Sequence, residues 1–209
     1  MAVEVTAQQV KELRDATGAG FQDCRKALLE NDGDIAKATD FLRKKGIATA
    51  AKKADRAANE GVIQSYIHHN GRLGVLVEVN SETDFVARND QFKKFAKDLA
   101  LHIANTAPRY VKREDIPQED IDRERSVQRG KTLNEGKKEA VVDKIVDGRM
   151  DKWYEEIVLL EQPWMHDDKS KVSDVLTQLI AEIKENIVIR RFARFALGED
   201  SGSDGTEAE

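Results

Sequence analysis

The dipeptide Asn70-Gly71 is the feature that most constrains how this chain can fold. It separates two runs, residues 62–68 and 72–80, in which apolar and polar residues alternate. Asn-Gly adopts the tight turns that match the twist of two antiparallel strands, so this arrangement is the strongest short-range signal for a β-hairpin. The sequence therefore predicts an antiparallel strand pair close to the start of a folded domain.

Helical patterns lie on both sides of the predicted hairpin. Residues 6–44 predict three short helices, the first of them capped by Thr6. Apolar residues recur at helical spacing in residues 91–105 and 172–183. Further strands are predicted at residues 156–160 and 187–197. The order of elements predicts an α+β fold, in which an antiparallel three-stranded sheet carries helices on one face.

The segment 117–155 differs from the rest of the chain in composition. Charged residues are dense, apolar residues are sparse, and Gly136 separates two helical stretches. Such helices can bury only one narrow stripe each, so we expect a helical hairpin that projects from the core.

These patterns predict four parts of the chain, in this order: a three-helix domain at 1–45, a basic linker at 46–60, a core domain at 61–198 that includes the hairpin of 117–155, and a disordered acidic tail at 199–209. The tail carries five acidic residues and no basic ones. Without it the chain has equal numbers of acidic and basic residues, which argues against direct binding of nucleic acid.

Several classes of protein are disfavoured by what the sequence lacks. No run approaches 18 consecutive apolar residues, so no membrane span is expected. No basic-then-apolar segment opens the chain, so no secretory signal is expected. Cys24 is the single cysteine, which fits a reducing compartment. We therefore expect a cytoplasmic protein.

The residue patterns of enzymes and of cofactor sites are also missing. Neither a P-loop nor a GxGxxG motif is present, and the four histidines lack metal-ligand spacing, so we expect no cofactor and no metal. Cys24 falls on the apolar side of a helix, where it acts as a small hydrophobe. An enzymatic alternative rests on His68, His69 and Glu82. The sequence favours a binding protein over an enzyme.

One connection carries an aromatic residue in an unusual place. Residues 83–90, here called the Phe85 segment, have the sequence TDFVARND and lie between a predicted strand and a predicted helix. Loop aromatics most often fold back onto their own core. The alternative is that Phe85, flanked by Asp84, enters a partner.

Two segments together resemble the signatures of the translation elongation factor Ts family. The first is VKELR at 10–14 followed by TGAG at 17–20 (the TGAG segment) and DCRKAL at 23–28, and the second is TDFVAR at 83–88. Gly148-Arg149-Met150, Gln162-Pro163 and the stretch NIVIRRF at 186–192 are similar too. The resemblance covers about residues 3–197.

This resemblance implies a function and a set of contact residues. Members of the family are guanine nucleotide exchange factors for the GTPase elongation factor Tu. The resemblance implies a ubiquitin-associated-like first domain, a coiled-coil hairpin, and a single core whose missing half a homodimer supplies. The residues implied to contact the GTPase are Thr83, Asp84, Phe85, Val86 and Arg88 of the core and Gly18, Gly20, Phe21 and Gln22 of the first domain.

The chain departs from the family at one place, and one other function stays open. Phe21-Gln22 follows the TGAG segment, where the family often has methionines. The alternative function is an adaptor without exchange activity, whose helical bundle binds peptides or ubiquitin-like partners. In that case changes in TDFVAR are silent.

Overall fold

A computed structural model describes residues 5–199, which form two compact units. The first unit comprises residues 5–62, 80–93 and 173–188, and the second comprises residues 63–79, 94–172 and 189–199. Apart from Glu199, the predicted acidic tail lies outside the described residues. Within the described part of the chain, no helix is both long enough and apolar enough to cross a membrane.

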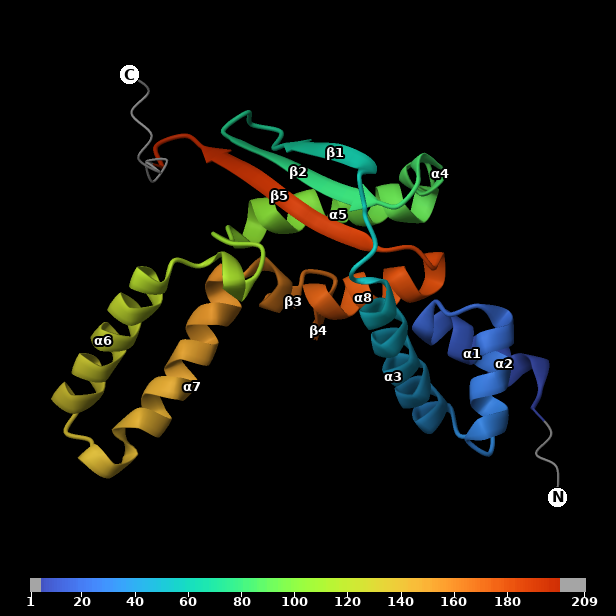
Figure 1. The fold of residues 1–209 in the computed structure, drawn as a ribbon, viewed down its shortest axis with the longest axis horizontal. Coiled ribbons are helices and arrows are strands. Elements are labelled where there is room, and N and C mark those ends of the chain that lie inside the picture. Colours follow the sequence, from blue (N-terminus) through green and yellow to red (C-terminus); the bar gives the residue numbers. More distant parts are fainter. Residues whose placement is uncertain (1–4, 200–209) are drawn as a thin grey trace. The chain divides into compact units, whose positions relative to one another are not determined.

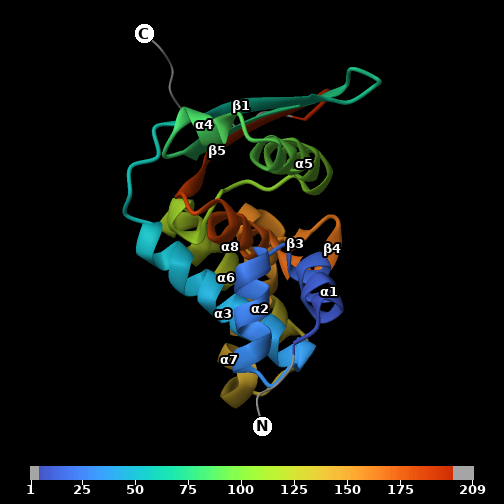
Figure 2. The ribbon, with the colours of Figure 1, turned by 90° about the vertical axis from the view of Figure 1, so that its right-hand side faces the viewer.

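Three helices open the first unit, as predicted (Figure 2): α1 (Ala7–Thr17), α2 (Phe21–Glu30) and α3 (Ile35–Lys53). Thr6 begins α1 with a capping box, in which Thr6 and Gln9 bond each other's backbone N–H. The buried core of the bundle consists of Val10, Leu13, Cys24, Ala27, Leu28 and Ala38. Helix α3 continues to Lys53, so the first half of the predicted linker is helical.

The first unit also contains most of α8 (Val172–Ile183), which lies against α3. Arg43 of α3 pairs with Asp174 of α8 at 3.1 Å. Gly46 lies where the two helices meet, since a Cβ at this position would be in van der Waals contact with the Cβ of Ala181, at 3.5 Å.

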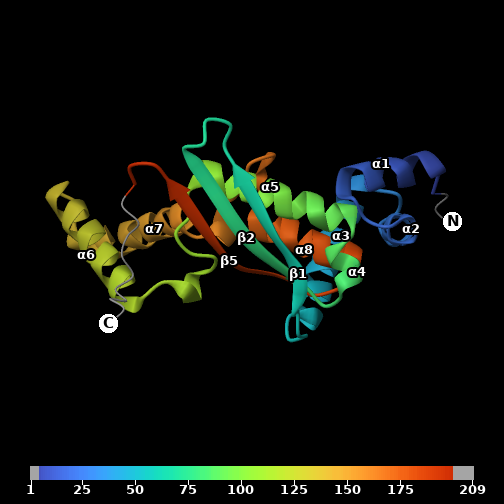
Figure 3. The ribbon, with the colours of Figure 1, turned by 90° about the horizontal axis from the view of Figure 1, so that it is seen from above.

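The second unit holds most of a three-stranded sheet (Figure 3). Its strands are β1 (Glu60–Ile67), β2 (Leu73–Ser81) and β5 (Ile187–Ala196), in the order β1-β2-β5. The sheet is antiparallel because its partners run in opposite directions: Leu197 bonds Arg72, whereas Arg191 bonds Glu78. The predicted hairpin and last strand are confirmed. Helix α5 (Asp90–Thr106) covers one face through Phe95, Leu99 and Ile103.

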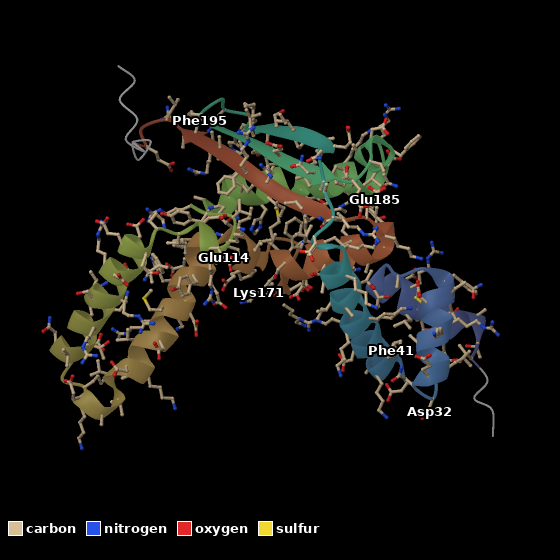
Figure 4. All side chains as sticks on the ribbon, viewed as in Figure 1. Asp32, Phe41, Glu114, Lys171, Glu185 and Phe195 are labelled. Atoms are coloured by element: carbon tan, nitrogen blue, oxygen red, sulfur yellow. The ribbon has the colours of Figure 1, made fainter. Side chains whose placement is uncertain are left out.

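The predicted helical hairpin is present in the second unit (Figure 1). Helices α6 (Gln118–Asn134) and α7 (Glu139–Ile157) run side by side, preceded by the short 3-10 helix η1 (Arg113–Asp115). Their buried stripe consists of Val142, Val146 and Met150, against which Ile121 and Trp153 pack. Figure 4 shows Glu114 within η1.

Two details of the sheet prediction need correction. Residues 156–160 are not a strand: α7 continues to Ile157, and a 3-10 helix, η2 (Leu159–Glu161), follows. Burial explains the apolar run, since Val158 and Leu159 are fully buried whatever their secondary structure. The sequence did not indicate the small antiparallel pair β3 (Pro163–Trp164) and β4 (Asp167–Lys171).

A buried histidine lies under this small strand pair. His102 of α5 is fully buried, stacks on Trp164, and its Nε2 lies 3.0 Å from Oε1 of Gln162. The same oxygen accepts a hydrogen bond from Thr106. Among the described residues, Nδ1 of His102 has no hydrogen-bond partner. Burial lowers the pKa of His102, because the charged ring is unfavourable away from water, and the hydrogen bond with Gln162 opposes this in part.

We expect this histidine to make folding sensitive to mild acid. The folded state disfavours the proton that the unfolded chain binds near pH 6.5, so stability is lost as the pH falls below that value. The variant His102→Gln should flatten this dependence and lower the free energy of unfolding at pH 7.5 by about 1–3 kcal/mol, since it disturbs the bond to buried Gln162. Thermal unfolding followed by circular dichroism from pH 5.5 to 8 measures both effects.

The exposed hairpin residue His69 provides the matched control. His69→Gln should keep the free energy of unfolding of the parent at pH 7.5, because this side chain is exposed. An unchanged slope in His102→Gln would show that another group sets the acid sensitivity.

Candidate functional site

The Phe85 segment forms a short helix rather than the loop that the sequence suggested. Residues Asp84–Ala87 make one helical turn, α4, and Thr83 is its N-cap. Oγ1 of Thr83 accepts a hydrogen bond from the N–H of Val86 at 3.5 Å, and the N–H of Arg88 bonds the carbonyl of Asp84 at 3.2 Å. One turn of helix is too short for sequence periodicity to indicate it.

Phe85 does not fold back onto the core of its own chain. Its side chain is 79% exposed, the largest exposed fraction among the large hydrophobic residues that are exposed in the described part of the chain. The turn is instead anchored by Ala87, which is buried, and by Val86, which is half-buried. The same turn therefore directs one apolar face inward and Phe85 into solvent.

The charged residues of the turn pair with each other. Asp84 and Arg88 form an ion pair at 2.8 Å, four residues apart along the chain. Because both side chains are largely exposed, this pair adds little to stability. It brings the carboxylate of Asp84 and the guanidinium of Arg88 together on the turn that carries Phe85.

The end of α8 holds the start of the Phe85 segment. Glu185 accepts two hydrogen bonds from Thr83, one from its N–H at 3.1 Å and one from its hydroxyl at 2.8 Å. Figure 4 shows Glu185 just beyond α8. The neighbouring Glu82 accepts a bond from the N–H of Asn186 at 2.6 Å, which lowers the pKa of the Glu82 carboxyl.

The TGAG segment contacts the same helix. Gly18 ends α1 with φ of +66°, a conformation that favours glycine, and a Cβ there would collide with the carboxylate of Glu182 in α8. Gln178 of α8 donates a hydrogen bond to the carbonyl of Thr17. Gly20 caps α2, which begins at Phe21.

The side chains that follow the TGAG segment face solvent. Phe21 is 50% exposed, and Gln22 is exposed as well. The first unit thus contains two exposed aromatic residues, Phe21 and Phe85, each within a few residues of a hydrogen bond to α8 or to the residues that directly follow it. All nine residues implied to contact a partner lie within this unit.

Glu182 joins the two segments. It accepts hydrogen bonds from Gln178 and from Gln91, which directly follows the Phe85 segment. Burial raises the pKa of the Glu182 carboxyl, and the two amide donors oppose that rise in part.

The sequence analysis did not identify Glu182 and Glu185 as parts of the site. A signal existed, because acidic residues are unfavourable near the C-terminal end of a helix dipole. Glu182 lies in the last turn of α8, which has no basic residue, and Glu185 follows two residues after the helix ends. Carboxylates in such positions indicate specific partners elsewhere in the chain.

Two of the three residues of the enzymatic alternative, His68 and Glu82, make structural hydrogen bonds, and the third, His69, lies against the ring of His68. His68 bonds the hydroxyl of Tyr66 at 2.8 Å in the second unit, whereas Glu82 in the first unit bonds Asn186 and Arg56. Cys24 is buried, and burial raises the pKa of its thiol, so it lacks the features of a nucleophile. Within residues 5–199, no group of three or more His, Cys, Asp or Glu side chains could hold a metal ion.

Comparison with known proteins identifies the family. The family model described as "Elongation factor TS" matches residues 5–199. A protein named elongation factor Ts from Carboxydothermus hydrogenoformans is 57% identical over 195 residues, covering 93% of this chain and 90% of the relative.

Two further relatives carry the same name. One from Thermoanaerobacter sp. (strain X514) is 54% identical over 203 residues, covering 97% of this chain and 100% of the relative. Another from Geobacter sulfurreducens is 53% identical over 197 residues, covering 94% and 91%. With the family model matching nearly all of the chain, this protein belongs to the elongation factor Ts family.

Proposed function

We propose that this protein is the guanine nucleotide exchange factor for elongation factor Tu and promotes the release of GDP from it. The observation that carries the proposal is Phe85, a 79% exposed phenylalanine on a helical turn that hydrogen bonds hold in place. Membership of the elongation factor Ts family supports the same function. The proposed activity makes and breaks no covalent bond, so it requires neither a catalytic residue nor a cofactor of its own.

Exchange requires the factor to bind one state of the GTPase better than another. If the factor lowers the affinity of the GTPase for nucleotide, nucleotide lowers the affinity of the GTPase for the factor by the same ratio. A shift of about 10⁴-fold corresponds to roughly 5.5 kcal/mol of differential binding. Burying one phenylalanine contributes about 1.5–3 kcal/mol. Phe85 is therefore insufficient alone, and a wider interface must provide the remainder.

The exposed elements of the first unit are suited to that wider interface. Phe21 and Gln22 begin α2, next to Gly18 and Gly20, and they offer a second apolar contact. We assign these four residues to the docking of the first, ubiquitin-associated-like domain. Thr83, Val86 and Arg88 shape the turn that presents Phe85.

The chemistry of the GTPase site suggests how the inserted ring acts. P-loop GTPases hold the nucleotide phosphates with backbone N–H groups, a lysine and a Mg²⁺ ion. In our proposal Phe85 enters between helices of elongation factor Tu, and Asp84 orients the turn through hydrogen bonds. The displaced helix then misplaces the ligands of the partner's Mg²⁺, which weakens the binding of GDP.

The other assignments follow from the same proposal. The factor acts in the cytoplasm, where translation takes place, and contacts neither membrane nor nucleic acid directly. The projecting hairpin, α6 with α7, is the coiled coil of the family. A relative of similar length, matched over its entire sequence, supports a single-core form.

We also propose that the protein is a homodimer. The face of the sheet opposite α5 exposes a set of large apolar side chains, here called the outer sheet face: Ile63, Ile67, Leu76, Phe195 and Leu197. Monomers rarely leave large contiguous apolar patches in water. A second copy of the same face would cover it symmetrically and would supply the second core that a single-core chain lacks.

The first prediction of the proposed function concerns Phe85. Phe85→Ala should lower the efficiency of GDP release from elongation factor Tu roughly 10- to 150-fold, the equivalent of the lost burial of one phenylalanine. Because the side chain is exposed in the free protein, the melting temperature should not change. Release of a fluorescent GDP analogue measures the rate.

A graded series keeps this test specific. Phe85→Leu should recover part of the rate, and Val127→Ala, at an exposed position of the hairpin, should match the parent. If Phe85→Ala releases GDP as fast as the parent, the insertion mechanism is wrong. If the parent binds partners but releases no GDP, the adaptor alternative replaces the proposal.

The second prediction concerns the outer sheet face. The parent should sediment as a dimer of about twice 23.5 kDa, and Phe195→Glu should sediment as a monomer, because the charge cannot be buried unpaired between two faces. Analytical ultracentrifugation at micromolar concentration measures both. The control Val127→Glu should remain dimeric, and a monomeric parent would contradict the dimer.

A further inference from the structure

The Phe85 segment is held on both sides by one short stretch of chain, residues 182–186. Glu82, directly before the segment, accepts a hydrogen bond from Asn186. Gln91, directly after it, donates one to Glu182. Glu185 lies between these two contacts and bonds Thr83, the residue that begins α4.

The contact between Glu185 and Thr83 fixes the direction of the helical turn. The two carboxylate oxygens accept both donors of Thr83, its backbone N–H and its hydroxyl. Since the hydroxyl proton points to Glu185, a lone pair of the same oxygen is left for the N–H of Val86. The carboxylate thus orients the N-cap, and the N-cap orients the turn that carries Phe85.

The backbone after α8 is shaped to place this carboxylate. Lys184 has φ of +64°, which is uncommon for a residue with a side chain, and its N–H bonds the carbonyl of Ile180. This left-handed residue ends α8 and redirects the chain immediately before Glu185. The positive φ of Lys184 and the negative charge of Glu185 near the C-terminal end of α8 each cost free energy when considered without tertiary contacts. The contact with Thr83 provides the compensation.

Helix α8 also contacts the TGAG segment, so contacts with α8 and the residues after it hold both segments that bear exposed aromatic residues. Gln178 bonds Thr17, and Glu182 lies against Gly18. We propose that Glu185 is a positioning residue for exchange: it holds the Phe85 segment in the orientation in which Phe85 inserts while the first domain docks. This inference rests on the exchange function proposed above.

A positioning role predicts a specific kinetic pattern. In Glu185→Ala, Thr83 loses both bonds and α4 loses the orientation of its cap, so a smaller fraction of the molecules presents Phe85 correctly. The maximal rate of GDP release should fall about tenfold, which corresponds to correct presentation of Phe85 in about one molecule in ten. The concentration of factor that gives half of this rate should change less than about twofold, because the wider interface sets docking.

Conservative variants separate positioning from stability. Glu185→Gln keeps an oxygen acceptor for one donor of Thr83 and should recover part of the rate, whereas Glu155→Ala, which removes an exposed carboxylate on α7, should match the parent. Trypsin gives a readout without the GTPase: cleavage after Arg88 should be faster in Glu185→Ala than in the parent, at an unchanged melting temperature.

The double variant decides whether Glu185 acts through Phe85. In the Phe85→Ala background, adding Glu185→Ala should lower the rate no further, because the group that it positions is already absent. Additive losses, or a rate in Glu185→Ala equal to that of the parent, overturn the positioning role. Equal rates for the parent and Phe85→Ala alone overturn the exchange mechanism itself, so the two failures are distinguishable.

Discussion

The bond between the carboxylate of Glu185 and the two donors of Thr83 joins parts of the sequence that are 102 residues apart. The position of the Phe85 segment depends on such contacts with α8 and with the residues that directly follow it. Without them α4 would be one isolated turn of helix, and a single turn does not form stably in water, because its nucleation costs more than one hydrogen bond returns. The helix that presents Phe85 is therefore a product of tertiary contact rather than of local sequence.

This dependence explains why so many polar groups gather around α8. Exposed ion pairs such as Asp84–Arg88 contribute little to stability, since water screens them. A carboxylate that accepts two bonds from one residue differs, because it restricts direction as well as distance. Glu182 and Glu185 each accept two hydrogen bonds, and both residues are partly buried. A fixed orientation matters for a side chain that is proposed to insert into a partner, because a side chain that is disordered before binding loses conformational entropy on binding.

Sequence periodicity was sufficient for the long elements and failed for the short ones. The Asn70-Gly71 hairpin and the first two helices of the bundle carry strong local signals, and their positions were predicted within a few residues, whereas α3 continues nine residues beyond the predicted end of the bundle at residue 44. The strand prediction at 156–160 was wrong because Val158 and Leu159 are apolar on account of their burial, which does not depend on a strand. The pair β3–β4 has one strand of only two residues, too short to show alternation. The nine predicted contact residues came from family resemblance, whereas Glu182 and Glu185 depend on long-range pairing that one sequence cannot show.

Phe85 is exposed and the neighbouring Ala87 is buried, so the two residues of the same turn are subject to different physical constraints. Phe85 contributes nothing to the folded state while it stands in water, so its type is free to suit a partner. Ala87 on the same turn is buried and keeps that turn on the core. A flexible loop could also expose a phenylalanine, but in the proposed mechanism it would lose conformational entropy when the ring inserts, and that loss would oppose binding to the partner. Because the contacts with α8 and the residues after it order the turn during folding, the entropy of ordering is lost before the partner binds and does not reduce the affinity.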